Sequence, residues 1–362
     1  MERNKARWIF GLEFWGESGK VGGMNPDENK PELIACELTR RCDCSCKHCR
    51  AGQTSEGDHE LKTEQWQKIF SAIADLNKVM LILTGGEPMK RDDIYELVAY
   101  GKKLGHRMAM ATCGYEINEE SIKRLKKAGI SVLSFSIDGA SAQKHDEIRQ
   151  TEGAFETVMR AAEVAKKAKV RFQINTTISK LNVDEFAGIA EIAHRIGATC
   201  FNPFIFVPTG QGKEISEAAL EPIEYEMVLH ELLRIKMEKK IKLRVTCSPQ
   251  FNKLLLQEKV ERVSKGKGRG CLGGQTFGFV SYKGDVQTCG FLDISAGNLV
   301  KNKYNFSKIW KDSPFLCEIR NRQGYKGRCG YCDYLSVCGG CRARAYEMTG
   351  DYLGTDPICM GD

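Results

Sequence analysis

No stretch of the 362-residue sequence approaches the roughly 20 consecutive apolar residues that a membrane-spanning helix needs. The longest apolar runs, such as residues 79–83, have the length of a strand. The opening MERNKARWIF carries charge but no apolar segment followed by a cleavage site, so it does not match a secretory signal. These absences argue against a membrane protein and a secreted one, and they predict a cytoplasmic protein.

The sequence also lacks the interleaving of basic and aromatic residues that is typical of nucleic-acid-binding proteins. Its basic run SKGKGRG, at residues 264–270, contains no aromatic residue, and the formal net charge of the chain is only +7. We therefore predict no nucleic-acid partner, whereas an anionic small substrate is compatible with this charge.

Cysteine, in contrast, is abundant, with 16 residues in the chain. Disulfides do not persist in a reducing compartment, so clustered cysteines there indicate metal binding or catalysis. One cluster lies at residues 42–49, and a second group follows residue 270. Four cysteines lie apart from these groups and are predicted to be small buried hydrophobic residues: Cys36, Cys113, Cys200 and Cys317.

Strand-like and helix-like segments alternate between residues 33 and 206. The strands are expected at residues 33–38, 79–86, 107–112, 131–138, 171–178 and 199–206, and the helices between them at 63–76, 92–104, 119–129, 154–168 and 183–197. This alternation predicts an α/β fold with a parallel sheet and right-handed crossovers. The cysteine cluster and the motifs TGGEP, TCG and SIDG each follow a strand, which predicts one site at the carboxyl ends of the strands.

The chain is expected to divide into four parts: an aromatic N-terminal extension at 1–30, an α/β domain at 31–215, a connecting helical segment at 216–267 and a cysteine-rich module at 268–362. The module is poor in regular apolar faces, so packing alone would stabilise it weakly. We expect bound metal to hold it together.

Cys42, Cys46 and Cys49 follow the spacing C-x3-C-x2-C. Three thiolates from one loop can hold three irons of a cubane cluster and leave the fourth iron open. A zinc site would need a fourth ligand, for which Cys44 is available. Cys44 alternates with Cys42 and Cys46, which is awkward for a single tetrahedron, so the spacing favours an iron–sulfur cluster.

This loop, with His48 before its last cysteine, and the GGEP motif resemble the radical S-adenosylmethionine (SAM) superfamily. The resemblance implies a partial (β/α)6 barrel, a 4Fe–4S cluster on the three cysteines and SAM chelated by the open iron. It further implies that SAM contacts Gly85, Gly86, Glu87, Pro88, His48, Ser136 and Arg149. Thr112 begins TCG, which departs from the superfamily's usual TNG. Val207 is either a contact of the SAM adenine or an ordinary core valine.

The spacing of seven later cysteines resembles the SPASM domain of radical SAM enzymes. The resemblance implies two auxiliary 4Fe–4S clusters, cluster one on Cys271, Cys289 and Cys341 and cluster two on Cys329, Cys332, Cys338 and Cys359. CGGC has two residues between its cysteines where that family has three, and cluster one lacks a fourth cysteine. Cys247 is a candidate for that position, and an inert buried thiol is an equally open interpretation. Two zinc sites are disfavoured because seven ligands do not form two closed tetrahedra.

Longer segments, including VPTGQGKE, GFVSYKGDVQTCGFLDI and CGGCRARAYEMTGDYL, resemble the AhbD-type heme synthases of the siroheme-dependent pathway. The resemblance implies oxidative decarboxylation of two propionates of Fe-coproporphyrin III to vinyl groups, which yields heme b. It implies an iron-porphyrin substrate and a low-potential electron donor such as flavodoxin or ferredoxin. Basic residues that could pair with the propionates are Arg171, Lys213, Arg342 and Arg344.

Three other interpretations stay open. AhbC- and NirJ-type enzymes, which remove tetrapyrrole side chains, share the CGGCRARA segment. Many SPASM enzymes modify peptides, but the first 30 residues are too short for a winged-helix domain that binds a leader peptide. An iron–sulfur electron carrier or a structural zinc protein would not explain GGEP at a strand end.

Overall fold

The computed structural model describes residues 30–52, 59–260 and 270–361. The aromatic extension and most of the basic run therefore lie outside the described residues. Within the described part of the chain, no helix combines the length and apolarity that a membrane span requires.

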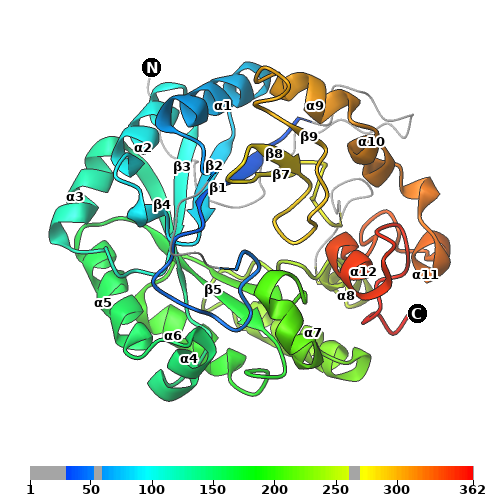
Figure 1. Ribbon diagram of the computed structural model, residues 1–362. Coiled ribbons are helices and arrows are strands. Elements are labelled where there is room, and N and C mark those ends of the chain that lie inside the picture. Colours follow the sequence, from blue (N-terminus) through cyan, green and yellow to red (C-terminus); the bar gives the residue numbers. More distant parts are fainter. Residues whose placement is uncertain (1–29, 53–58, 261–269, 362) are drawn as a thin grey trace, which may run out of the picture.

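One nine-stranded sheet forms the centre of the molecule, in the strand order β6-β5-β4-β3-β2-β1-β7-β8-β9 (Figure 1). Strands β1 to β7 run parallel to one another. The first six are β1 (Leu33–Thr39), β2 (Met80–Gly85), β3 (Arg107–Thr112), β4 (Ile130–Ser136), β5 (Phe172–Ile178) and β6 (Phe201–Ile205). The predicted parallel α/β fold is confirmed.

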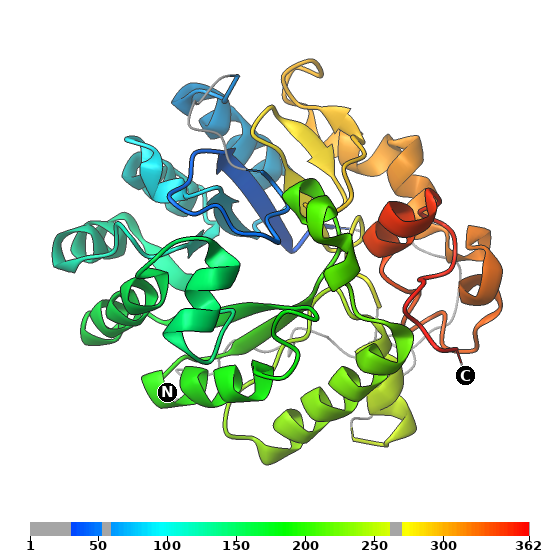
Figure 2. The ribbon, with the colours of Figure 1, turned by 60° about the horizontal axis from the view of Figure 1, so that its bottom comes forward.

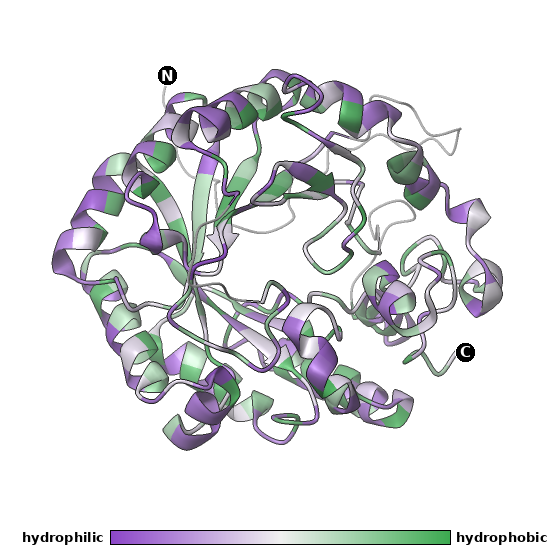
Figure 3. Cartoon of the chain, in the orientation of Figure 1, coloured by the Kyte–Doolittle hydropathy of each residue, from purple (hydrophilic) through white to green (hydrophobic). Residues whose placement is uncertain are grey.

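Helices follow these strands and lie in an arc outside them, with apolar residues facing the sheet (Figures 1 and 3). They are α1 (Thr63–Leu76), α2 (Ile94–Lys103), α3 (Glu119–Ala128), α4 (Ala142–Arg149), α5 (Ala154–Lys167) and α6 (Phe186–Ile196). The stripe of α1 that carries Trp66, Ile69 and Ile73 is fully buried, as its spacing predicts. The short α4, which the sequence analysis missed, buries only His145 and Ile148.

The C-terminal part of the chain extends the same sheet rather than forming another. Strand β7 (Phe277–Val280) pairs in parallel with β1, and β8 (Asp285–Gln287) and β9 (Gly297–Asn298) follow in antiparallel order. These strands have four, three and two residues, too few for an alternating pattern to stand out. At the other end of the sheet, Leu243 and Thr246 form parallel bridges with β6.

The remaining helices surround the cysteine-rich segment. They are α7 (Pro222–Glu238), α8 (Gln250–Gln257), α9 (Phe306–Asp312), α10 (Pro314–Arg320), α11 (Gly327–Tyr331) and α12 (Arg342–Thr349), with short 3-10 turns at Pro88–Lys90, Gly210–Ala218 and Arg322–Gly324. Figures 1 and 2 both place α12 (red) between α10 (orange) and α7 and α8 (green). The C-terminal segment therefore lies between the β6 side and the β7 side of the sheet.

Candidate active site

The loop of Cys42, Cys46 and Cys49 follows β1 and lies against the GGEP loop that follows β2. The amide of Gly86 donates to Thr39 O at 2.7 Å, and that of Glu87 donates to Arg41 O at 2.7 Å. A Cβ on Gly85 would lie 2.2 Å from Thr39 O, and one on Gly86 would lie 2.3 Å from Arg41 O. The two glycines are thus required by the close approach of two backbones.

The thiols of this loop are neighbours. Cys44, which is buried, contacts both Cys42 and Cys46. Cys49 lies close enough to Cys46 for the charge of Cys46 to contribute to the raised pKa of Cys49, after the larger effect of burial. The hydrogen bond from Cys44 and the positive charge of Arg149 lower the pKa of Cys46. Arg149 Nη1 lies 3.2 Å from Cys46 Sγ. A thiol with a lowered pKa is suited to bind iron, because the thiolate is the ligand.

Cys113 also belongs to this site, so its prediction as an isolated hydrophobic residue is wrong. Its Sγ donates to Glu87 Oε2 at 2.8 Å, and its thiol contacts those of Cys42 and Cys44. The replacement of the usual TNG by TCG was the sequence signal that could have identified it. Cys317 is likewise exposed rather than buried, whereas Cys36 and Cys200 are buried as predicted.

Glu87 is completely buried, and its carboxylate binds the end of β3. Its Oε2 accepts hydrogen bonds from Thr112 Oγ1 at 2.9 Å and from the Cys113 amide at 2.7 Å. Its Oε1 accepts from the Met89 amide at 2.9 Å. The Glu87 side chain thereby joins the GGEP and TCG loops, which gives Thr112 a structural role.

The burial of Glu87 leads to a prediction about pH. Burial raises its pKa from 4.5 to about 7, although its hydrogen bonds oppose this rise. The folded protein therefore holds a proton that the unfolded chain releases, and the stability that this proton contributes is lost as the pH rises through about 7. Relative to Glu87→Gln, the wild-type protein is expected to lose up to about 3 kcal/mol of unfolding free energy between about pH 5 and about pH 8.

Thermal unfolding of the cluster-free protein at several pH values measures this difference. Glu64→Gln, at an exposed position on α1, is the control. The difference in unfolding free energy between wild type and Glu64→Gln should stay constant with pH. A constant difference between wild type and Glu87→Gln across the range would contradict the prediction.

Asp138, in the SIDG motif, is a buried residue of the site that the sequence analysis did not single out. Its Oδ2 lies 2.8 Å from Arg149 Nη2 and 3.6 Å from His48 Nε2. Its Oδ1 accepts from the Thr177 amide at 2.7 Å. Asp138 thus holds Arg149 and His48 beside the cysteine loop, while Ser136 ends β4 two residues earlier.

The residues around the cysteine loop fit a 4Fe–4S cluster with SAM. Arg149 Nε and the Tyr115 hydroxyl are buried and have no hydrogen-bond partner among the described residues. Such polar groups next to the thiols suit the carboxylate and ribose of SAM. No three His, Cys, Asp or Glu side chains of the described residues converge on one ion position. A cubane cluster instead gives each thiolate its own iron.

The PTGQGK segment after β6 lies directly on the cysteine loop. The amide of Gln211 donates to Cys49 O at 2.9 Å, and a Cβ on Gly210 would lie 2.0 Å from Arg50 O. From the same segment, Lys213 forms an ion pair of 2.9 Å with Glu347 of α12. PTGQGK therefore connects the cysteine loop to the C-terminal module.

Arg50 lies where the loop of Cys49 meets the loop of Cys289. Its Nη1 binds the buried carboxylate of Glu37 at 3.1 Å, and its guanidinium lies 4.6 Å from the ring centre of Phe279. A Cβ on Gly290 would lie 2.9 Å from Arg50 Nε. A positioned cation thus stands between the two cysteine-bearing loops.

The cysteines expected to hold cluster one lie together in the structure. The Cys289 thiol lies near those of Cys271 and Cys341, whose charges add to the effect of burial in raising its pKa. Cys341 packs with Cys289 and with Val207, which is fully buried and so belongs to the core at this position. Cys247 also lies in this group and contacts Cys341.

Three of the four cysteines expected to hold cluster two are also neighbours. The Cys338 thiol lies near those of Cys359 and Cys329, whose charges add to the effect of burial in raising its pKa. Backbone amides lie close to two of the sulfurs, that of Gly340 at 3.4 Å from Cys338 Sγ and that of Asp356 at 3.4 Å from Cys329 Sγ. Such N–H contacts are a feature of iron–sulfur sites. Cys332 follows three residues after Cys329, at the end of α11.

The basic residues considered as partners of propionates have other contacts. Arg344 is buried and binds Asp356, and Arg342 is buried and donates to Tyr352 O at 3.0 Å and Gly354 O at 2.6 Å. Lys213 binds Glu347, and Arg171 precedes β5 at the amino end of the sheet. These four residues are therefore poor candidates for substrate binding.

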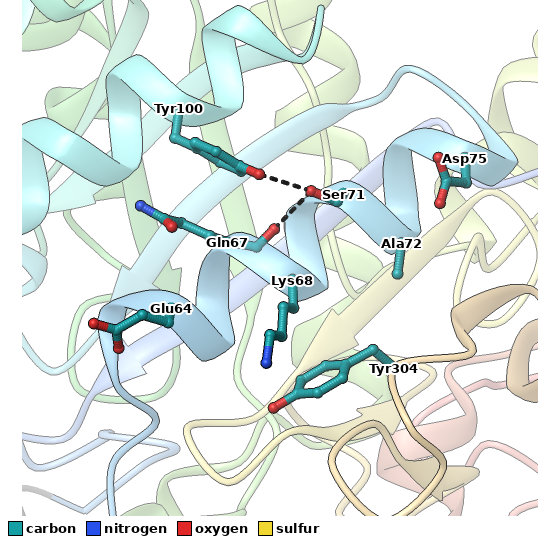
Figure 4. A pocket seen from close by; sticks show the side chains of 8 residues that line it. All are labelled: Glu64, Gln67, Lys68, Ser71, Ala72, Asp75, Tyr100 and Tyr304. Atoms are coloured by element: carbon teal, nitrogen blue, oxygen red, sulfur yellow. Dashed lines mark hydrogen bonds between the residues drawn. The ribbon is translucent and has the colours of Figure 1, made fainter.

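A hollow on the outer surface is unrelated to this site. It lies between α1, α2 and Tyr304, where Ser71 Oγ is 3.0 Å from Tyr100 Oη and Lys68 lies over the Tyr304 ring (Figure 4). It lies on the helix-covered side of the sheet, away from the cysteine loop and the GGEP motif.

Comparisons with known proteins agree with this arrangement. A model of the radical SAM superfamily matches residues 36–193. An AdoMet-dependent heme synthase of Methanosarcina barkeri (strain Fusaro) is 42% identical over 342 residues, which cover 92% of this chain and 97% of the relative. A Fe-coproporphyrin III synthase of the same organism is 28% identical over 355 residues, which cover 92% of this chain and 88% of that relative. Streptococcus suis SuiB, solved with its precursor peptide SuiA, shares the fold with a TM-score of 0.75 at 15% identity, over 92% of this chain and 76% of SuiB.

The fold, the cysteine loop and the matched model define a radical SAM enzyme. Within that superfamily, the chain belongs to the family of the AdoMet-dependent heme synthases.

Proposed function

We propose that this enzyme removes carbon dioxide from two propionates of Fe-coproporphyrin III and forms heme b. Each propionate loses one hydrogen atom from its β-carbon, one molecule of carbon dioxide and one electron, and becomes a vinyl group. The observation that carries the proposal is the position of Arg50. PTGQGK and CGFLDI, two segments on which the likeness to heme synthases rests, both pack against this residue between the two cysteine-bearing loops.

In this proposal, Cys42, Cys46 and Cys49 hold the SAM-binding 4Fe–4S cluster. Gly85, Gly86, Glu87 and Pro88 place the loop that receives the amino group of SAM, and Arg149, with Ser136 and His48 nearby, binds its carboxylate and ribose. When bound, SAM and its cluster would supply a carbon radical for removal of the hydrogen atom, and an auxiliary cluster would supply an acceptor for the electron that remains. Arg50, held in place by Glu37, lies between the cysteine loop and the loop of Cys289.

The C-terminal segment is proposed to be a SPASM-type module. Cys271, Cys289 and Cys341 would hold auxiliary cluster one, and Cys329, Cys332, Cys338 and Cys359 would hold cluster two. Their grouping in the structure supports this assignment. A low-potential protein such as flavodoxin or ferredoxin would supply the electron that SAM cleavage consumes.

Anaerobic turnover of the reconstituted protein with SAM, a reductant and Fe-coproporphyrin III tests the proposal. Mass spectrometry should show two successive losses of a carboxyl group from the porphyrin, with one 5′-deoxyadenosine formed for each. Formation of 5′-deoxyadenosine with an unchanged porphyrin would contradict the heme synthase function. It would favour removal of other tetrapyrrole side chains or modification of a peptide.

A further inference from the structure

Four cysteine thiols from separate segments meet between the two sides of the sheet. Cys271 precedes β7 and Cys289 follows β8, whereas Cys341 caps α12. The fourth, Cys247, directly follows Thr246, which pairs with β6 on the opposite side of the sheet. Cys247 contacts the Cys341 thiol and lies within range of the charge of Cys289. The group is therefore one thiol larger than the SPASM pattern expects for cluster one.

The backbone of Cys247 adopts a left-handed conformation, which is unfavourable for a residue with a Cβ. Its φ is +58°, in the left-handed region that residues with a Cβ seldom occupy. Such outliers persist where the surrounding structure enforces them, and they are frequent at functional sites. The strain at Cys247 is consistent with a side chain that must point to one particular position.

Arg344 enforces this conformation and links Cys247 to Cys341. Its guanidinium binds both carboxylate oxygens of Asp356, at 2.8 and 2.7 Å, and its Nη1 donates to Cys247 O at 3.0 Å. Asp356 Oδ2 in turn accepts from the Cys341 amide at 2.7 Å. One buried ion pair thus fixes the backbones of both cysteines relative to each other.

An inert buried thiol has different surroundings in this protein. Cys36 lies in the apolar core within β1, away from the other thiols of this group. Cys247 instead packs, together with Cys289, against the buried cluster that contains Cys341. Cys247 therefore resembles the three expected ligands and differs from Cys36.

We propose that Cys247 is the fourth thiolate ligand of auxiliary cluster one. The inference rests on the auxiliary cluster of the proposed function. With four thiolates, every iron of this cluster is coordinated by the protein, so the porphyrin does not bind to it. Such a cluster would supply an electron acceptor that has no iron open to the substrate, and its four ligands would join the β6 side of the sheet to the β7 side.

The test uses the full-length protein with Cys42, Cys46 and Cys49 each changed to Ala, which removes the first cluster and its open iron. The auxiliary clusters are reconstituted anaerobically, reduced and exposed to isotopically labelled imidazole, which binds only an iron that lacks a protein ligand. Pulsed EPR then detects nitrogen coupled to the cluster. Cys247→Ala and Cys247→Ser are compared with Cys200→Ala, which removes a buried thiol next to β6.

The parent and Cys200→Ala are expected to show no nitrogen coupling. The Cys247 variants should show coupling, the EPR signal of a three-iron cluster, or loss of one cluster's iron. Nitrogen coupling in the parent, or Cys247 variants with spectra and iron content equal to the parent, would overturn the proposal. The readout needs no porphyrin, so failed heme formation with the expected spectra would count against the heme synthase function alone.

Discussion

Arg344→Met is expected to lower the unfolding free energy by about 3–5 kcal/mol, because it leaves the carboxylate of Asp356 buried without its cation. Both side chains are fully buried, and Arg344 also binds the carbonyl of Cys247. For a chain of this size the loss corresponds to a fall in Tm of about 4–7 °C. Thermal unfolding of the cluster-free protein measures it. We also expect less iron at cluster one after reconstitution, because Cys247 and Cys341 lose their common support.

Arg234→Met on α7 is the matched control. Arg234 forms ion pairs with Glu231 and Glu238 on the exposed surface, and such pairs contribute little to stability. Its Tm and iron content should equal those of the wild type. An Arg344→Met protein with an unchanged Tm would show that the pair with Asp356 does not stabilise the module.

Replacing both charges should not rescue the protein. A buried ion pair can often be exchanged for apolar residues with little cost. Here Asp356 also accepts hydrogen bonds from the Cys341 amide and from Gln250 Nε2 at 2.7 Å. Arg344→Met with Asp356→Leu would leave these donors unpaired, so we expect its Tm to stay below the wild-type value.

The parts of this protein that could be predicted from sequence are those set by local spacing. The six parallel strands have apolar runs separated by helical patterns, and the cysteine loop and GGEP stand at strand ends. Strands β7 to β9 could not be predicted because they are too short to carry a pattern, and they form by pairing with β1 and with each other.

Contacts between distant segments also could not be predicted from the sequence. Asp138 belongs to the site because it holds Arg149 and His48 after folding. Arg342 and Arg344 were candidate partners of the propionates, yet both are buried with polar partners. A buried arginine is recognisable only with its partner in view, and for Arg344 that partner is Asp356, twelve residues away.

Gly86→Ala is expected to reduce 5′-deoxyadenosine formation by at least about 100-fold, the cost of misplacing reacting groups by about 1 Å. The new Cβ would lie 2.3 Å from Arg41 O and 2.7 Å from Arg40 O. Both neighbours are backbone atoms, so rotation of a side chain cannot relieve the clash. The chain that leads into Cys42 must move instead, away from the hydrogen bonds that join it to GGEP.

Gly324→Ala provides the control, because Gly324 is exposed and its nearest atom to a new Cβ is Asn321 Nδ2 at 3.9 Å. Both variants should keep the circular dichroism spectrum of the wild type, since Gly86 lies after β2 rather than within the core. Iron analysis then separates two causes of the loss. Less iron in Gly86→Ala would mean that the displaced loop no longer assembles its cluster, whereas full iron would mean that SAM is misplaced. Activity within about threefold of the wild type would contradict the prediction, since the loop would then have absorbed a displacement of about 1 Å without cost.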